Sequence, residues 1–113
     1  MKRLSTKQQD NSVIISIDGD IEFDDAFQLS NTLQSNFVDE IHNIILNLKN
    51  CQYIDSMGLG ALARTLTITK KNKKNFMLCN LSPDCKEIIM MTMLNKHMNI
   101  YNNVEDCIAS VNA

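Results

Sequence analysis

The apolar residues of the chain alternate between strand-like and helix-like spacing. Residues 13–17, Val-Ile-Ile-Ser-Ile, form a run rich in β-branched side chains, which predicts a strand that ends at a turn at Asp18-Gly19. Residues 3–8 are expected to form a partner strand, joined to this run through residues 9–12. Beyond the turn the spacing becomes helical, with apolar side chains at Ala26, Leu29, Leu33 and Phe37.

The rest of the chain continues this alternation. Residues 42–48 form a nearly continuous apolar run of strand length, which suits a strand buried on both faces of a sheet. Ser82-Pro83-Asp84 is typical of a helix start, with a capping serine, a proline in the first position and an acid in the first turn. Between residue 48 and Ser82, an apolar stripe at Leu59, Leu62, Ala63 and Leu66 predicts an amphipathic helix. The remaining expected elements are a strand at residues 76–79, a short strand at 100–101 and a helix at 103–111.

This order of elements predicts an α/β fold. Strands and helices that alternate with short connections are typical of a largely parallel sheet. We expect a small mixed, mostly parallel sheet of four to five strands with about four helices, which should cover both of its faces because the central strands are apolar on both sides. A length of 113 residues fits one domain, residues 1–113.

Composition and charge exclude several classes of function. The 11 basic and 13 acidic side chains give a net charge of −2, so the chain lacks the overall positive field of proteins that bind nucleic acids or anionic membranes. No apolar run approaches the roughly 18 residues of a membrane span, and the N-terminus has no hydrophobic signal region. We therefore expect a cytoplasmic protein without membrane insertion or direct nucleic-acid binding.

The cysteines do not follow the spacing of a metal site. No two of them form a C-x-x-C pair, and the two histidines, His42 and His97, are distant from them in sequence. We interpret them as small buried thiols in a reducing compartment and expect no metal or other cofactor. The four are Cys51, Cys79, Cys85 and Cys107.

Two other clusters each allow two interpretations. Four lysines between residues 70 and 74 would complement the carboxyl end of a helix; nucleic-acid binding is the alternative, but only Phe76 is close enough in sequence to stack on a base. A second cluster, of four methionines, is interpreted as core and edge packing, with an adaptable docking surface as the alternative. It consists of Met90, Met91, Met93 and Met98.

The hexapeptide Asp-Ser-Met-Gly-Leu-Gly, residues 55–60, contains two of the three glycines of the chain. Each glycine inside a helix costs about 1 kcal/mol relative to alanine, so a helix that starts here has a local reason for bare backbone. We expect Ser56 to be the N-cap, with its hydroxyl accepting a hydrogen bond from the backbone N–H of Gly58 or Leu59. A cap explains the serine but not the glycines.

Three kinds of chemistry use a serine at the start of a helix. A nucleophile elbow needs G-x-S-x-G, but position 54 is Ile, and nothing in the sequence places a histidine near Ser56. Both glycine-rich phosphate-binding signatures are absent, which argues against a nucleotide-binding enzyme. A serine at an exposed helix start with little steric cover could instead accept a phosphoryl group, which adds about −1.5 to −2 charges. We expect a regulatory protein and no enzyme.

The chain resembles the STAS domain, the family of anti-sigma-factor antagonists. Residues 43–94 are similar to its pattern of an apolar strand, a turn into Asp-Ser-[Ser/Thr]-Gly-Leu-Gly, a helix, a second strand, Ser-Pro and another helix. Residues 15–22 resemble the strand that leads to the Gly-Glu-Leu-Asp of the family. The resemblance covers about residues 12–111.

The resemblance implies a switch in which a kinase that is also an anti-sigma factor phosphorylates Ser56. The unphosphorylated form would bind this kinase and free a sigma factor, and a metal-dependent Ser/Thr phosphatase would reset the switch. Asp55 would shape the surroundings of the serine, Gly58 and Gly60 would let the partner approach, and two acids would lie on the same rim. The implied docking residues are Asp20, Glu22, Asp55, Ser56, Met57, Gly58, Leu59 and Gly60.

Three departures from the family pattern concern the partner rather than the fold. Met57 stands where the family has a small hydroxyl residue, Asp20-Ile21-Glu22 reverses the order of the two acids, and residues 91–94 lack a glycine. The alternative function is a STAS scaffold subunit of a lipid-transport or stress-signalling assembly, in which the same helix end is an interface and phosphorylation is absent or secondary.

Overall fold

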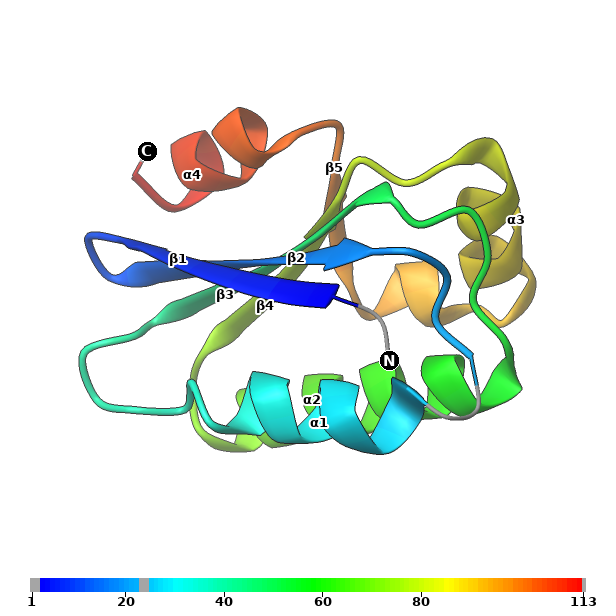
Figure 1. The fold of residues 1–113 in the computed structure, drawn as a ribbon. Helices are drawn as coiled ribbons and strands as arrows, with labels where there is room; N and C mark the ends of the chain where they lie inside the picture. Colours follow the sequence, from blue (N-terminus) through cyan, green and yellow to red (C-terminus); the bar gives the residue numbers. More distant parts are fainter. Residues whose placement is uncertain (1–2, 23–24, 113) are drawn as a thin grey trace.

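A five-stranded sheet forms the centre of the computed structural model, which describes residues 3–22 and 25–112 (Figure 1). The strands lie in the order β1-β2-β3-β4-β5, so each strand pairs with its neighbour in sequence. The first pair is antiparallel and the other three pairs are parallel. The strands are β1 (Arg3–Gln9), β2 (Ser12–Asp18), β3 (Asn43–Asn50), β4 (Asn75–Cys79) and β5 (Asn99–Tyr101).

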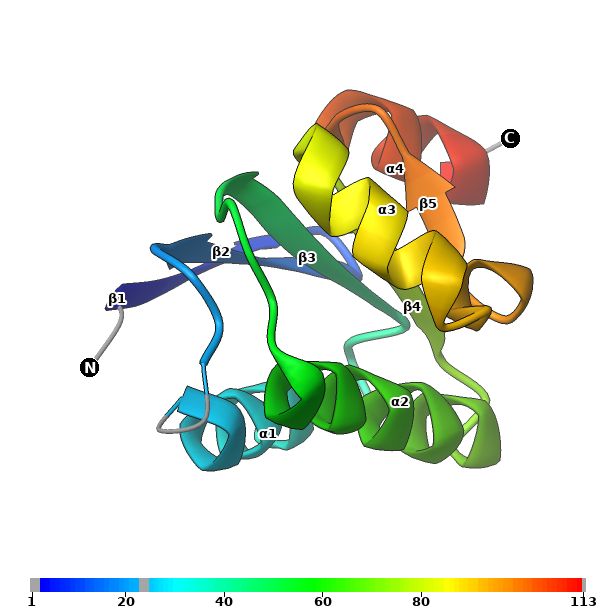
Figure 2. The same cartoon turned by 90° about the vertical axis from the view of Figure 1, so that its right-hand side faces the viewer.

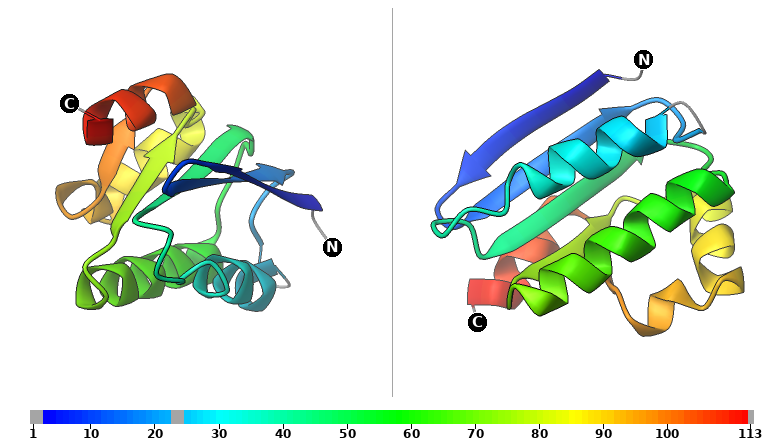
Figure 3. Two further views of the ribbon diagram at one scale, coloured as in Figure 1. Left: turned by 90° about the vertical axis from the view of Figure 1, so that its left-hand side faces the viewer. Right: turned by 90° about the horizontal axis from the view of Figure 1, so that it is seen from below.

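Helices cover both faces of this sheet. On one face α1 (Ala26–Gln34) and α2 (Ser56–Lys71) run side by side beneath the strands, as the view from below shows (Figure 3). On the opposite face lies α4 (Val104–Asn112). At one end of the molecule α3 (Pro83–Met91) stands in front of β4 and β5 (Figure 2), and a short 3-10 helix, η2 (Leu94–Lys96), follows it.

The two faces of the central strands explain the nearly continuous apolar run of β3. Ile44 and Leu46 belong to the large core beneath the sheet, whereas Ile45 belongs to a smaller cluster under α4. All three side chains are fully buried. The prediction of an α/β fold with a small mixed, mostly parallel sheet and helices on both faces is therefore confirmed.

One prediction of packing is wrong. Met90, Met91 and Met93 are 56%, 76% and 51% exposed, so they are not core residues, and only Met98 of that cluster is buried. The reason is geometric: α3 turns Cys85 and Ile89 toward the core, and the two methionines at its end follow on its outer side.

The lysines at the end of α2 complement its carboxyl end, and one that follows the helix also fixes a connection. Lys70 and Lys71 lie in the last turn of the helix. The Lys74 ammonium donates hydrogen bonds to the carbonyl oxygens of Val38 and Ile41, at 2.8 and 2.6 Å. It thereby ties the segment before β3 to the segment before β4.

Within residues 3–22 and 25–112, no helix has the length and apolarity needed to cross a membrane.

Candidate functional site

Two loops meet at the edge of the sheet where the parallel strands β2 and β3 end. The Ile21 N–H donates to the carbonyl of Tyr53 at 3.0 Å, and the Asp55 N–H donates to the carbonyl of Ile21 at 3.0 Å. These bonds continue the parallel pairing as an isolated bridge between Ile21 and Ile54. The loop after β2 and the loop into α2 are therefore held side by side, as the carboxyl ends of neighbouring parallel strands require.

Asp55, and not Ser56, is the N-cap of α2. Its backbone is extended, and its carboxylate accepts a hydrogen bond from the Gly58 N–H at 2.9 Å. Ser56 is the first helical residue, so the prediction that its hydroxyl caps the helix is wrong. Both residue types are good caps. The bond from the Asp55 N–H to Ile21 keeps Asp55 in the extended conformation that a cap needs and moves the helix start by one residue.

This shift leaves the Ser56 hydroxyl free. Ser56 is exposed, and its hydroxyl forms no hydrogen bond with any residue in the described part of the chain. It stands in the first turn of a 16-residue helix, where unpaired N–H groups and the helix dipole favour a negative charge. A group bound to this oxygen would extend into solvent at the positive end of α2.

The two glycines of the hexapeptide have different surroundings. Gly58 is buried, and a β-carbon built on it would lie 2.6 Å from Cγ2 of Ile21 and 2.9 Å from Cγ2 of Ile54. A β-carbon on Gly60 would meet only the Arg64 guanidinium, at 3.5 Å. Gly58 is therefore required for α2 to approach the strand ends, a packing reason that sequence alone did not provide.

The two acids before α1 reach the same edge of the sheet. The Asp20 carboxylate accepts hydrogen bonds from the backbone N–H groups of Gln52 and Tyr53, at 2.9 and 3.1 Å. Glu22 is exposed, and its backbone N–H donates to the Asp25 carboxylate at 3.0 Å. Asp20 thus holds the loop that leads to Ser56, in addition to any contact with a partner.

Apolar side chains flank this polar edge. Met57 is 44% exposed, whereas Leu59 packs against the large core. Sequence reasoning missed two further exposed side chains, Phe27 at 77% and Tyr53 at 50%. Phe27 lies outside the stripe formed by Ala26 and the other apolar residues of α1, so helical spacing alone could have identified it.

A pair of thiols joins this edge to α3. Cys51, at the start of the loop into α2, lies 4.0 Å from Cys85, measured between the sulfur atoms. The hydrogen bond between the two thiols is the main cause that lowers the pKa of Cys85 to about 7, and the Ser82 hydroxyl lowers it further. The same hydrogen bond and burial raise the pKa of Cys51.

All four cysteines are free and buried, which confirms their interpretation as buried thiols. In the described residues, no group of three or more His, Cys, Asp or Glu side chains is arranged to hold a metal ion.

Comparisons with known proteins agree with this architecture. The family model of the STAS domain matches residues 3–107. An anti-sigma-B factor antagonist of Staphylococcus aureus is 26% identical over 102 residues, which cover 90% of this chain and 94% of that protein. An anti-sigma F factor antagonist of Paenibacillus polymyxa is 31% identical over 64 residues, which cover 57% of this chain and only 55% of that relative.

Solved structures share the whole fold. An anti-sigma factor antagonist from Mycobacterium paratuberculosis matches with a TM-score of 0.89 at 21% identity, over all of this chain and 96% of the other. The antagonist SpoIIAA in its unphosphorylated form gives 0.82 at 18% identity, covering 97% and 96%. The phosphorylated form of the Bacillus protein SpoIIAA gives 0.74 at 18% identity, covering 96% and 99%. With its order of strands and helices and a family match over nearly its full length, this chain belongs to the STAS-domain family.

Proposed function

We propose that this chain is an anti-sigma-factor antagonist whose binding to an anti-sigma factor with serine kinase activity is switched by phosphorylation of Ser56. The observation that carries the proposal is the exposed, unbonded hydroxyl of Ser56 in the first turn of α2, directly after the capping Asp55. The names of the relatives from Staphylococcus aureus and Paenibacillus polymyxa support the same class of function.

In the unphosphorylated state the start of α2 is the docking surface. The acids Asp20, Glu22 and Asp55 form its polar rim, and Met57 contributes an exposed apolar contact beside the serine. Beneath the helix start Gly58 is buried and Leu59 packs against the large core. A β-carbon on Gly60 would meet only the Arg64 guanidinium. An anti-sigma factor that is bound to this surface would be unable to bind its sigma factor.

Phosphorylation changes charge at one point and leaves the fold intact. The Ser56 oxygen forms a bond to the γ-phosphorus of ATP held by the kinase, the bond to ADP breaks, and the hydroxyl proton passes to a base of the kinase. The product carries about −1.5 to −2 charges. The positive end of α2 tolerates this charge, but a partner packed over Ser56 meets it beside the Asp55 carboxylate.

The chemistry of this cycle belongs to the partners. The kinase supplies ATP and the catalytic base, and a Ser/Thr phosphatase removes the phosphoryl group. The chain itself is a non-enzymatic, single-domain switch over residues 1–113 that acts in the cytoplasm, where ATP and the transcription machinery are present.

The test uses small ATP-binding serine kinases encoded in the same genome, purified one by one and incubated with labelled ATP and the full chain. Ser56→Ala should abolish phosphorylation, whereas Ser35→Ala, which removes another exposed serine hydroxyl at the end of α1, should leave it unchanged. Ser56→Asp should weaken kinase binding on the order of a hundredfold, equivalent to about 2.7 kcal/mol.

Two results would contradict the proposal. Phosphorylation that persists in Ser56→Ala would disprove the site, and a Ser56→Asp chain that binds the kinase as tightly as the wild type would disprove the switch. A chain that assembles only with transporter subunits or with large homologous complexes, and with none of the kinases, would favour the scaffold function.

A further inference from the structure

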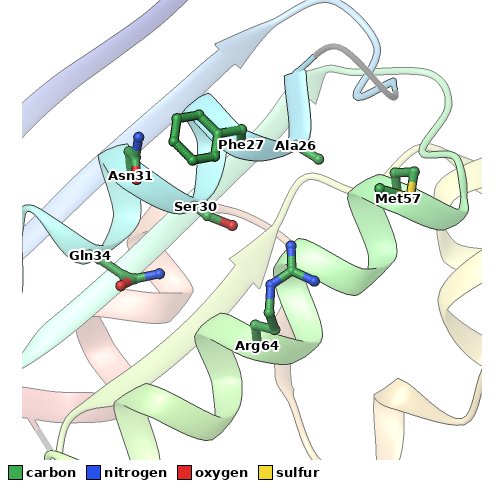
Figure 4. Close-up of a pocket in the computed structure, with 7 residues that line it drawn as sticks. All are labelled: Ala26, Phe27, Ser30, Asn31, Gln34, Met57 and Arg64. Atoms are coloured by element: carbon green, nitrogen blue, oxygen red, sulfur yellow. The ribbon is translucent and has the colours of Figure 1, made fainter.

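A groove of about 620 Å³ lies between α1 and α2, next to the proposed switch (Figure 4). Phe27, Ser30 and Gln34 line it from α1, and Met57 and Arg64 line it from α2. The groove is open to solvent rather than enclosed, so it would cover one side of an extended segment instead of surrounding a small molecule.

The Ser30 hydroxyl in the wall of this groove has no hydrogen-bond partner. Ser30 is only 7% exposed, and among the described residues its Oγ is the buried side-chain polar atom left unsatisfied. A buried unsatisfied hydroxyl costs about 1–3 kcal/mol, and most such groups in native proteins are bonded. In Figure 4 this hydroxyl points from α1 toward α2, into the space that an occupant would fill.

Arg64 provides a free positive charge on the opposite wall. No acidic side chain of residues 3–22 or 25–112 forms an ion pair with it, and its guanidinium turns toward α1 (Figure 4). A guanidinium presents a rigid set of donors that matches a carboxylate with two parallel hydrogen bonds. On a chain of net charge −2, this cation selects an acidic group.

Two exposed apolar side chains lie at the end of the groove where α1 and α2 begin. Phe27 is 77% exposed and Met57 is 44% exposed. Exposed aromatic and methionine side chains are typical of surfaces where proteins bind one another. Met57 directly follows Ser56, so the groove and the start of α2 form one continuous surface.

We propose that the groove between α1 and α2 binds an acidic segment with apolar residues, supplied by the anti-sigma factor that docks on Ser56. A carboxylate of this segment pairs with Arg64, a polar group hydrogen-bonds to the Ser30 hydroxyl, and an apolar side chain packs against Phe27 and Met57. This inference rests on the proposed function for the identity of the partner. It also explains Met57, because an apolar residue beside the serine extends the groove to the switch.

The groove can be tested without the partner protein. The probes are two hexapeptides with blocked ends, Leu-Asp-Glu-Leu-Asp-Leu and the neutral Leu-Asn-Gln-Leu-Asn-Leu, each added to the nitrogen-15-labelled full chain and followed by NMR. The acidic peptide should shift the backbone amides of Ser30, Gln34 and Arg64, with an affinity at least fivefold above that of the neutral peptide. Arg64→Gln should abolish this difference, whereas Lys70→Gln, which removes the same charge from an exposed site on the same helix, should keep it.

The results separate this inference from the proposed function. Equal binding of the two peptides, shifts outside the groove, or an equal loss in Arg64→Gln and Lys70→Gln would overturn the groove as an acidic-peptide site. In the kinase assay, Arg64→Gln should weaken binding at least tenfold and Lys70→Gln less than twofold. If both bind as the wild type does while Ser56→Ala still abolishes phosphorylation, the switch stands and the groove proposal fails.

Discussion

The side chain of Ile21 fills the space in which Gly58 would carry a β-carbon, with Cγ2 of Ile21 only 2.6 Å from that position. Ile21 pairs with Ile54 in the bridge that extends the sheet beyond β2 and β3. The first turn of α2 thus lies directly on this bridge. The packing of Gly58 sets how far the start of the helix stands from the sheet, and therefore where the Ser56 hydroxyl lies.

Alanine substitutions at the two glycines should have opposite effects on stability. Gly58→Ala forces a methyl group against two packed isoleucines and should lower the free energy of unfolding by about 1–3 kcal/mol. Gly60→Ala meets only the flexible Arg64 side chain and should raise it by about 0.5–1 kcal/mol, because alanine favours the helix. Urea unfolding followed by circular dichroism measures both, and equal effects would contradict this account of Gly58.

Substitutions at the helix start should identify Asp55 as the cap. Asp55→Ala removes the acceptor for the Gly58 N–H and should cost about 1 kcal/mol of unfolding free energy. Asp55→Asn, which keeps an acceptor oxygen, should cost only a few tenths. Ser56→Ala should change stability by less than about 0.5 kcal/mol, because the hydroxyl is exposed and unbonded. A larger loss in Ser56→Ala than in Asp55→Ala would return the cap to the serine.

Local spacing in the sequence predicted the order of elements but not the contacts between them. The apolar run at residues 42–48 and the stripe of α2 identify their elements, since each depends on neighbours in sequence. The choice between Asp55 and Ser56 as cap depends on a hydrogen bond to Ile21, more than thirty positions earlier. The groove beside Ser30 likewise exists only because α1 and α2 pack side by side, so no periodicity within either helix could predict it.

Asp20 should hold the loop into α2 through its carboxylate. Asp20→Ala removes the acceptor for two exposed backbone N–H groups and should cost about 1 kcal/mol of unfolding free energy. The amide protons of Gln52 and Tyr53 should exchange faster in this variant, as measured by hydrogen exchange and NMR. Asp20→Asn keeps an oxygen acceptor and should protect them largely as the wild type does. Asp18→Ala, at an exposed acid at the end of β2, is the matched control and should leave both amides unchanged.

The thiol pair of Cys51 and Cys85 should make stability depend on pH. In the folded state the pKa of Cys85 is about 7, mainly because of its hydrogen bond with the Cys51 thiol, whereas an unfolded cysteine titrates near about 8.5. A lowered pKa stabilises the fold fully above about pH 8.5, and this contribution is lost as the pH falls through about 7. The free energy of unfolding, measured in urea with a reducing agent, should therefore rise between pH 6.5 and 9 relative to Cys85→Ser, and the raised pKa of Cys51 opposes part of this rise. The lowered pKa of Cys79 contributes to both chains and cancels in this comparison. Cys51→Ala, which removes the partner thiol, should reduce the rise, and parallel pH curves for the wild type and Cys85→Ser would contradict the assignment.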